Sequence, residues 1–280
     1  MASAQFCPVT RLEKLLVATD RSEFSQGAIT EAINFAKKCS SKVYVMSVLE
    51  TNPEYETIGS KAYEEEESEA IKHLESVKER AKQEGVDCEA ILVSGNEPHE
   101  LIVNEAAEKK VDMIIIGRHG RKGLLKLLMG QVAARVIGNA ACNVLVVPKS
   151  ARIQYRNILI ATDGSKYSEA AAAEGLSIAK RCGSSIIALS SIRTSDELEW
   201  AKANTAKVLE MAQKEEVPAE AVTPQGKSYD TIVETAGGRG VDLIVMGNYG
   251  TTGIKKLLMG SSTEKVIGNA GCAVLVVKSL

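Results

Sequence analysis

VIGNAACNVLVV at residues 136–147 returns as VIGNAGCAVLVV at residues 266–277, with two changes. Self-similarity at a long, fixed spacing marks an internal duplication. Further matches occur in the same order along the chain: KLLVATD at 14–20 with NILIATD at 157–163, VDMIIIG at 111–117 with VDLIVMG at 241–247, and KLLMG at 126–130 and again at 256–260. We therefore predict two copies of one module, residues 1–150 and 151–280.

The two copies differ in length. The spacing between matched segments falls from 143 residues at the first match to 130 at the later ones, so the first copy has about 13 extra residues. The most economical place for them is near residues 50–63. A chain of 280 residues is also long enough for two domains, each with its own core.

Strand-like and helix-like patterns alternate in each copy. Short apolar runs rich in β-branched residues, such as VYVMSV and NVLVV, are typical of strands buried on both faces of a parallel sheet. Helical patterns lie between them, at 22–38, 63–84, 97–109, 166–181, 196–215 and 228–236. This alternation predicts an α/β fold with five strands per copy in a doubly wound sheet, and a linker at about 149–155.

Composition excludes several classes of protein. The net charge of −2 argues against a polyanion-binding surface, so we expect no nucleic-acid partner. No apolar run approaches the length that crosses a bilayer, and the first residues lack a signal-peptide core, so we expect a cytoplasmic protein without a membrane partner. The six cysteines form no CxxC pair, and we expect them to be small, buried packing residues.

An aspartate ends the first strand of each copy, Asp20 and Asp163. In open α/β sheets, ligands bind beyond the carboxyl ends of the strands, where the strand order reverses. A carboxylate there accepts ribose hydroxyls or holds a metal through water. The alternative is that the aspartate only caps the following helix, a role that Ser22 and Ser165 could fill instead.

A glycine loop follows the fourth strand of the second copy. Gly247, Gly250 and Gly260 bring bare backbone close to an anion, and successive N–H groups then form an anion-binding concavity. Ser261, followed by Ser262, opens the sequence SSTE, which predicts a capping box with Glu264 and a helix whose free N–H groups face the same space. The alternative is that the glycines only shape the loop and Ser261 only caps.

The first copy keeps the glycines but not the serine. Gly117, Gly120 and Gly130 are present, whereas Gln131 replaces the hydroxyl residue and QVAA is no capping box. We expect a less well defined helix start and weaker or absent phosphate binding there. Arg118 and His119 stand where the second copy has Asn248 and Tyr249, and they either supply charge or block the pocket.

With these motifs both copies resemble the universal stress protein domain, and the chain resembles its tandem form, from about residue 12 to 277. The most specific element is G-x2-G-x9-G-[S/T], which Gly247, Gly250, Gly260 and Ser261 match in full. The resemblance implies binding of ATP with Mg²⁺, or of AMP or another adenine nucleotide. It further implies that Asp163 and Asp20 lie near the ribose, with Asp163 at the metal, and that Ser191 and Val48 touch adenine through backbone groups.

The same resemblance implies a fold. It is an adenine nucleotide alpha hydrolase-like, five-stranded parallel sheet of order 3-2-1-4-5, with helices on both faces. Dimerisation in this family runs through the last strand, so residues 143–148 would face 273–277 within one chain and cover two apolar edges. Further pairing of whole chains into a homodimer is compatible with this arrangement.

Three functions follow from these features. The first is a stress-response protein that binds ATP in a regulatory or sensing role, mainly through the second copy. The second is a slow ATPase or phosphotransferase, for which Lys255 and Lys256 would offer positive charge although no general base stands beside the loop. The third is a nucleotide-free scaffold for protein interactions.

Overall fold

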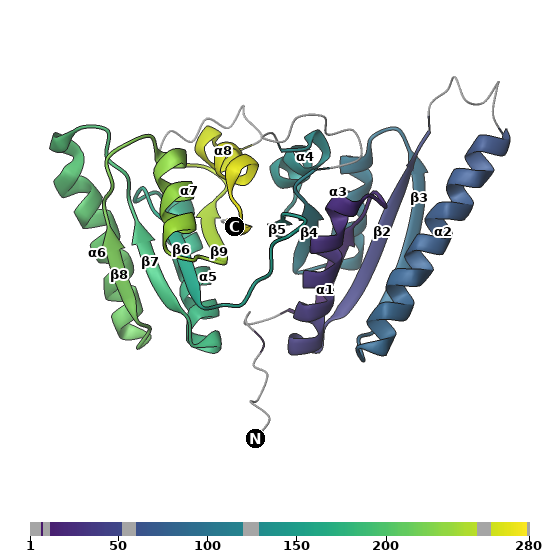
Figure 1. Ribbon diagram of the computed structural model, residues 1–280, viewed down its shortest axis with the longest axis horizontal. Helices are drawn as coiled ribbons and strands as arrows, with labels where there is room; N and C mark the ends of the chain where they lie inside the picture. The colour runs from purple at the N-terminus through teal and green to yellow at the C-terminus, as the bar shows by residue number, and fades with distance from the viewer. Residues whose placement is uncertain (1–6, 8–11, 52–59, 120–128, 251–258, 279–280) are drawn as a thin grey trace.

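The computed structural model describes residue 7 and residues 12–51, 60–119, 129–250 and 259–278. Figure 1 shows the two copies side by side. The strands of the first copy are β1 (Lys14–Ala18), β2 (Lys42–Glu50), β3 (Cys88–Gly95), β4 (Met113–Gly117) and β5 (Asn143–Val147). Its helices are η1 (Glu23–Ser25), α1 (Gln26–Cys39), α2 (Ser60–Gln83), α3 (Pro98–Lys109) and α4 (Gln131–Asn139).

The second copy repeats this order of elements. Its strands are β6 (Asn157–Ala161), β7 (Ser185–Leu189), β8 (Ala219–Val222), β9 (Leu243–Gly247) and β10 (Ala273–Val277). Its helices are α5 (Lys166–Cys182), η3 (Ser195–Glu197), α6 (Leu198–Lys214), α7 (Ser228–Gly238) and α8 (Ser261–Asn269). The predicted alternation of strands and helices is confirmed.

All ten strands form one sheet, in the order β3-β2-β1-β4-β5-β10-β9-β6-β7-β8. Within each copy this is the predicted order 3-2-1-4-5, and the strands that pair there are parallel. The copies meet at β5 and β10, which pair antiparallel with Leu145 opposite Leu275. The predicted pairing of the two last strands is therefore confirmed as the seam of the molecule.

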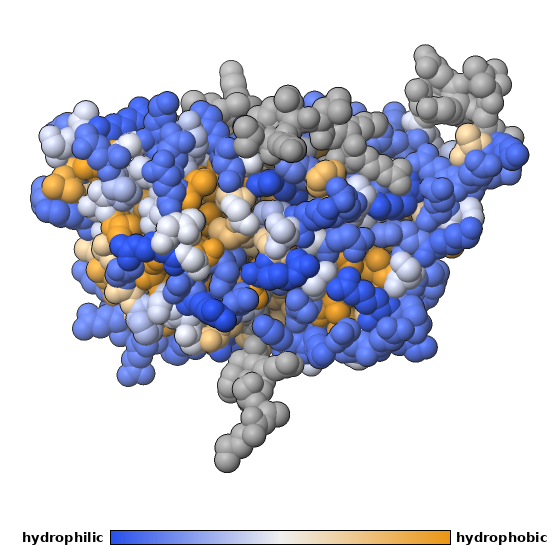
Figure 2. All heavy atoms as spheres, viewed as in Figure 1, coloured by the Kyte–Doolittle hydropathy of each residue, from blue (hydrophilic) through white to orange (hydrophobic). Residues whose placement is uncertain are grey.

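Helices cover both faces of the sheet. One buried apolar cluster lies beneath α1, α2, α5 and α6, and the other beneath α3, α4, α7 and α8. Each cluster contains residues of both copies, so the hydrophobic core is continuous across the seam. On the face in Figure 2, hydrophilic residues predominate and apolar ones lie in patches between them. No helix in the described ranges is long and apolar enough to cross a membrane.

Each copy sends a cation to a helix end in the other copy. The Arg118 guanidinium donates to the carbonyl of Ala270, which follows α8, at 2.7 Å. The Lys278 ammonium donates to the carbonyl of Ile137 in α4, and burial lowers the pKa of Lys278 to about 8. Cations suit helix C-termini because the last carbonyls there lack partners and carry partial negative charge.

The linker packs into the core. Ala151, Ile153 and Tyr155 are buried, and the Tyr155 ring meets Phe35 edge-on at 5.8 Å between centroids. The carboxylate of Glu31 in α1 accepts a hydrogen bond from the backbone of Ile153, and burial raises its pKa. The linker is therefore part of the folded unit.

The expectation that all cysteines serve only packing is wrong for one pair. Cys7 and Cys39 form a disulfide across 32 residues of sequence. Cys88, Cys142, Cys182 and Cys272 are free thiols that pack against the core clusters, but they are only partly buried, not buried as expected. The sequence hid the bond because Cys7 lies outside the repeated segments and the two cysteines are far apart along the chain.

The extra length of the first copy falls around the second strand and helix. β2 has nine residues and α2 has 24, against five in β7 and 17 in α6. Residues 52–59, inside the segment where we expected the insertion, lie outside the described residues.

Candidate functional site

The aspartate and the glycine loop of the second copy meet at one edge of the sheet. β6 and β9 are parallel neighbours, so their carboxyl ends lie side by side. β6 also pairs with β7 on its other side, which makes its end the point where the strand order reverses. A Cβ on Gly250 would lie only 2.7 Å from Oδ2 of Asp163. The predicted convergence of Asp163 and Gly250 is present in the structure.

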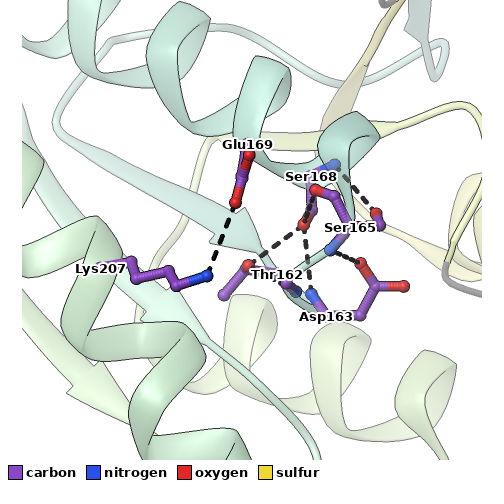
Figure 3. Close-up of polar contacts among 7 residues, drawn as sticks. Thr162, Asp163, Ser165, Ser168, Glu169 and Lys207 are labelled. Atoms are coloured by element: carbon purple, nitrogen blue, oxygen red, sulfur yellow. Dashed lines mark hydrogen bonds and ion pairs between the residues drawn. The ribbon is translucent and has the colours of Figure 1, made fainter.

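Asp163 is not the cap of the following helix. Ser165 is the N-cap of α5, and its hydroxyl accepts from the N–H of Ser168 at 3.2 Å (Figure 3). Oδ1 of Asp163 accepts from the N–H of Ser165 at 3.1 Å, while Oδ2 lies toward Gly250. This arrangement removes the alternative that Asp163 is there to cap α5.

A network of hydroxyls holds the backbone beneath Asp163. The hydroxyls of Thr162 and Ser168 lie 3.2 Å apart, and Ser168 also accepts from the N–H of Asp163 at 3.4 Å (Figure 3). Above them, Lys207 of α6 pairs with Glu169 of α5 at 3.7 Å. Because Thr162 and Ser168 are both buried, these bonds fix the loop and so the direction of the carboxylate.

Gly164 lets the loop turn sharply after Asp163. Its φ of +72° lies in the left-handed region, where a side chain is strained. A Cβ there would also lie 2.4 Å from Oδ1 of Asn204, a buried α6 residue whose Nδ2 has no hydrogen-bond partner within the described part of the chain. In the first copy the same turn is made by Arg21, with φ +68°, and its guanidinium pairs with Glu66 at 2.5 Å.

The helix start at α8 differs from the predicted capping box. Gly260, not Ser261, is the N-cap, no side chain of the described residues caps the helix, and the carbonyl of Gly260 accepts from the N–H of Glu264 at 3.1 Å. Ser261 and Ser262 are thus the first two helical residues, so their N–H groups are among those that lack intrahelical partners. The capping-box prediction is wrong, whereas the predicted position of the helix N-terminus is confirmed.

The first copy has the same helix start. Gly130 is the N-cap of α4 with φ −62° and ψ 143°, against −66° and 141° at Gly260. In both loops the glycine N–H donates to a backbone carbonyl, of Arg118 at 2.9 Å and of Asn248 at 2.8 Å. The expectation of a less well defined start at Gln131 is therefore wrong, because backbone groups build this turn and the serine does not.

Other side chains fix the loop in ways that the sequence did not indicate. The Thr263 hydroxyl, in the first turn of α8, donates to the carbonyl of Gly247 at 3.1 Å. Asn248 is 7% exposed, and its Oδ1 has no partner among the described residues. Tyr249 meets Tyr167 edge-on at 5.5 Å between centroids. A repeat comparison gives no signal for these residues, because the first copy has other residue types at most of these positions.

The glycines that end β4 and β9 have a packing role. A Cβ on Gly247 would lie 2.8 Å from the backbone of Tyr167, and one on Gly117 would lie 2.8 Å from the carbonyl of Phe24. In each copy, this close approach packs the first helical turn after the first strand against the end of the fourth strand. Gly120 lies outside the described residues, as do Lys255 and Lys256.

Arg118 reaches across the seam to the second copy. Its guanidinium donates to Ala270 across the seam and to Nε2 of His119 at 3.1 Å. The ring of His119 meets Phe24 edge-on at 6.0 Å, and burial together with Arg118 lowers the pKa of this histidine. Asp20 accepts from the N–H and the hydroxyl of Ser22, at 3.1 and 2.7 Å. That Arg118 and His119 supply charge to the pocket or block it stays a prediction.

Ser191 and Val48, the two residues predicted to contact adenine, lie at the second strand of their copies. Ser191 follows β7, and its hydroxyl donates to that of Ser228 at 2.8 Å. Val48 lies within β2, opposite Val93 of β3. That their backbone groups touch adenine stays a prediction.

The side chains at the site would bind a magnesium ion only together with the phosphate oxygens of a nucleotide. Within the described ranges no three His, Cys, Asp or Glu side chains gather as a metal site. Mg²⁺ is often held by one or two carboxylates with phosphate oxygens and water. Asp163 and the phosphates of a bound nucleotide would supply those ligands.

Comparison with known proteins places both copies in one group. The family model described as the universal stress protein family matches residues 11–148 and 154–278. A universal stress protein of Methanocaldococcus jannaschii is 39% identical over 49% of this chain and 82% of its own length. Another, of Bacillus subtilis, is 33% identical over 48% of this chain and 97% of its own length.

A solved structure covers both copies at once. The crystal structure of a universal stress protein from Archaeoglobus fulgidus has a TM-score of 0.75, with 22% identity, over 95% of this chain and 98% of its own. This likeness extends the comparison to the arrangement of the two copies along one sheet.

Proposed function

The chain belongs to the universal stress protein family, and from that premise we propose that it binds ATP with Mg²⁺ in a regulatory or sensing role, through the second copy. The observation that carries the proposal is the approach of Gly250 to the Asp163 carboxylate, where a Cβ would lie at 2.7 Å. A glycine so close to a fixed carboxylate leaves bare backbone facing the space where a ribose and its phosphates would lie.

Each part of the site has a task in this proposal. Asp163 accepts the ribose hydroxyls and holds Mg²⁺ together with the phosphates. The N–H groups of Ser261 and Ser262, at the start of α8, face the phosphates, and the partial positive charge of the helix N-terminus favours them. The Ser261 hydroxyl, which is not used as a cap, is available to donate to a phosphate oxygen.

Binding, not turnover, is the role that these groups support. Hydrolysis needs a group that positions water and usually a cation at the γ-phosphate. Of the described cations on α5 and α6 near Asp163, Lys207 is paired with Glu169 at 3.7 Å (Figure 3), and Lys166 lies over the ring of Tyr167 at 5.1 Å. We place the function in sensing adenine nucleotide, in the cytoplasm that the sequence predicts.

Thermal unfolding with and without MgATP tests the proposal. Ligand at about 100 times Kd adds ~2.7 kcal/mol, which raises Tm by several degrees. Gly250→Ala puts a methyl group against Asp163, so we expect at least a tenfold weaker Kd. Gly271→Ala is the matched control, because a Cβ there meets nothing within 4 Å. A wild-type protein whose Tm does not move in millimolar MgATP would contradict the proposal.

A second measurement separates the binding protein from a scaffold. Protein purified without added nucleotide is denatured, and the supernatant is assayed for adenine nucleotides. We expect adenine nucleotide from the wild type and from Asp20→Asn, and much less from Asp163→Asn. Equal losses in both variants would place the ligand in both copies.

A further inference from the structure

The disulfide fastens the start of the chain to the end of a helix. Cys39 is the last residue of α1, and Cys7 stands five residues before the buried Leu12. Next to the bond, the Ser41 hydroxyl donates to the carbonyl of Leu12, and the N–H of Lys42 donates to the carbonyl of Glu13 at 2.8 Å. Leu12 and Glu13, just before β1, are thus held by hydrogen bonds, and Cys7 is held by a covalent bond.

The second copy makes the same two hydrogen bonds before its first strand, but without a disulfide. The Ser184 hydroxyl donates to the carbonyl of Tyr155 at 2.6 Å, and the N–H of Ser185 donates to that of Arg156 at 2.9 Å. The residue that corresponds to Cys7 is Ser150, in the linker that continues from β5. Cys182, which corresponds to Cys39, is a free thiol. In the first copy the disulfide attaches Cys7 to the fold. In the second copy the corresponding residue, Ser150, is attached because the chain continues from β5.

We propose that the Cys7–Cys39 bond is a reversible redox latch, closed in oxidising conditions and opened by a low-molecular-weight thiol of the glutathione class. In opening, a thiolate attacks one protein sulfur and forms a mixed disulfide, and a second thiolate releases it. The protein gains two electrons and two protons and becomes a dithiol, while two small thiols become one small disulfide. Closing runs the same exchange in reverse, with the small disulfide as oxidant.

The surroundings of the bond suit exchange. Cys7 and Cys39 are both half-buried, so one side of the bond is within reach of a small thiol. Burial raises the pKa of the Cys182 thiol, which keeps this cysteine protonated and a poor nucleophile. Disulfides that form in reducing compartments are usually transient or redox-sensing, in contrast to structural ones.

Equilibration of the full-length protein in glutathione buffers tests the latch. The redox state is read by trapping thiols with a maleimide of known mass, and intact mass spectrometry then counts them. We expect two extra labels in the reduced form, with a midpoint inside the range that glutathione buffers cover. Cys7→Ser and Cys39→Ser lose this two-label step, whereas Cys182→Ser, the repeat-matched control, keeps it.

Stability gives an independent readout. Closing a loop of this length restricts the unfolded chain, so reduction is expected to lower Tm on the order of 5 °C in the wild type and in Cys182→Ser, but not in Cys7→Ser. Six labels in oxidised protein, a bond that glutathione does not reduce, or a crosslink that contains Cys182 would each overturn the proposal. None of these results depends on nucleotide binding.

Discussion

The two copies share a backbone and differ in the side chains around it. Their helices α4 and α8 begin at a glycine N-cap with nearly the same dihedral angles, although one continues with Gln131 and the other with Ser261. Their first loops turn at the same left-handed position, although one has Arg21 and the other Gly164. The comparison teaches that backbone groups build the shape of these loops, while side chains make the two copies differ.

The seam is where the copies are most alike, and its loss is expected to have the largest effect. Leu145 and Leu275 oppose one another in β5 and β10, and each is 1% exposed. Replacing either with alanine removes buried methyl groups and leaves a cavity, at about 2–5 kcal/mol of unfolding free energy. Urea denaturation measures this, with Ile71→Ala, at a half-exposed site, as control. Clearly unequal losses at the two leucines would show that the copies do not share the seam evenly.

Arg118 marks a difference between the copies, since its counterpart Asn248 does not make the same contact. Arg118→Met leaves the buried carbonyl of Ala270 without its donor, so we expect a loss of about 1–3 kcal/mol. Asn248→Leu removes an oxygen that has no partner in the described chain, and should cost no more than about 1 kcal/mol. Chemical denaturation of both variants gives the comparison, and a smaller loss for Arg118→Met would contradict the seam contact.

The buried Glu31 and the half-buried Glu174 occupy corresponding positions, and desolvation raises the pKa of both. A carboxyl whose folded pKa is raised holds its proton more tightly in the folded state, so its contribution to stability falls as pH rises above the ordinary value of 4.5. Glu31→Gln and Glu174→Gln should each flatten this decline between pH 4.5 and 7, by about 1 kcal/mol or less.

The two substitutions should differ at neutral pH. Glu31 accepts from the backbone of Ile153, whereas Oε1 of Glu174 has no partner in the described ranges. Glu174→Gln is therefore expected to leave the free energy of unfolding at pH 7 unchanged or to raise it. Glu31→Gln is expected to give a lower free energy of unfolding than Glu174→Gln. Thermal unfolding from pH 4.5 to 8 checks both, and a pH profile that neither substitution alters would contradict the assignment.

The smallest effect is expected at Ser261. A serine N-cap replaced by alanine costs about 1 kcal/mol, but Ser261 lies one residue inside the helix, so Ser261→Ala should change stability by only a few tenths. The same substitution should weaken ATP binding through loss of a hydroxyl. Scanning calorimetry measures the stability, titration calorimetry measures ATP binding, and together they separate the two effects. A loss of about 1 kcal/mol in unfolding free energy would support the capping box.

Much of the fold could be predicted from the sequence because the same pattern of strands and helices occurs twice in the chain. The strand order and the seam came from the resemblance to the universal stress protein family, whereas matched segments in matched order predicted the strand-helix alternation and the meeting of Asp163 with the glycine loop. These features depend on local patterns and on the known handedness of strand-helix-strand units.

The rest depends on contacts between residues far apart in sequence, which no local pattern reports. Arg118 reaches Ala270 in the other copy, and Cys7 reaches Cys39 from outside the repeats. The capping-box error has another origin, since the pattern SSTE satisfies the rule while the preceding Gly260 takes the N-cap position. Residues at such sites are identified only once the backbone is in place.

The linker between β5 and β6 sets the effective concentration at which the two copies pair through β5 and β10. Joined by a short, packed linker, they find each other at a local concentration that does not change when the protein is diluted. Cut into separate halves, each would present a bare, apolar strand edge, and assembly would then follow mass action. The presence of both copies in one chain thus makes their association a property of a single molecule.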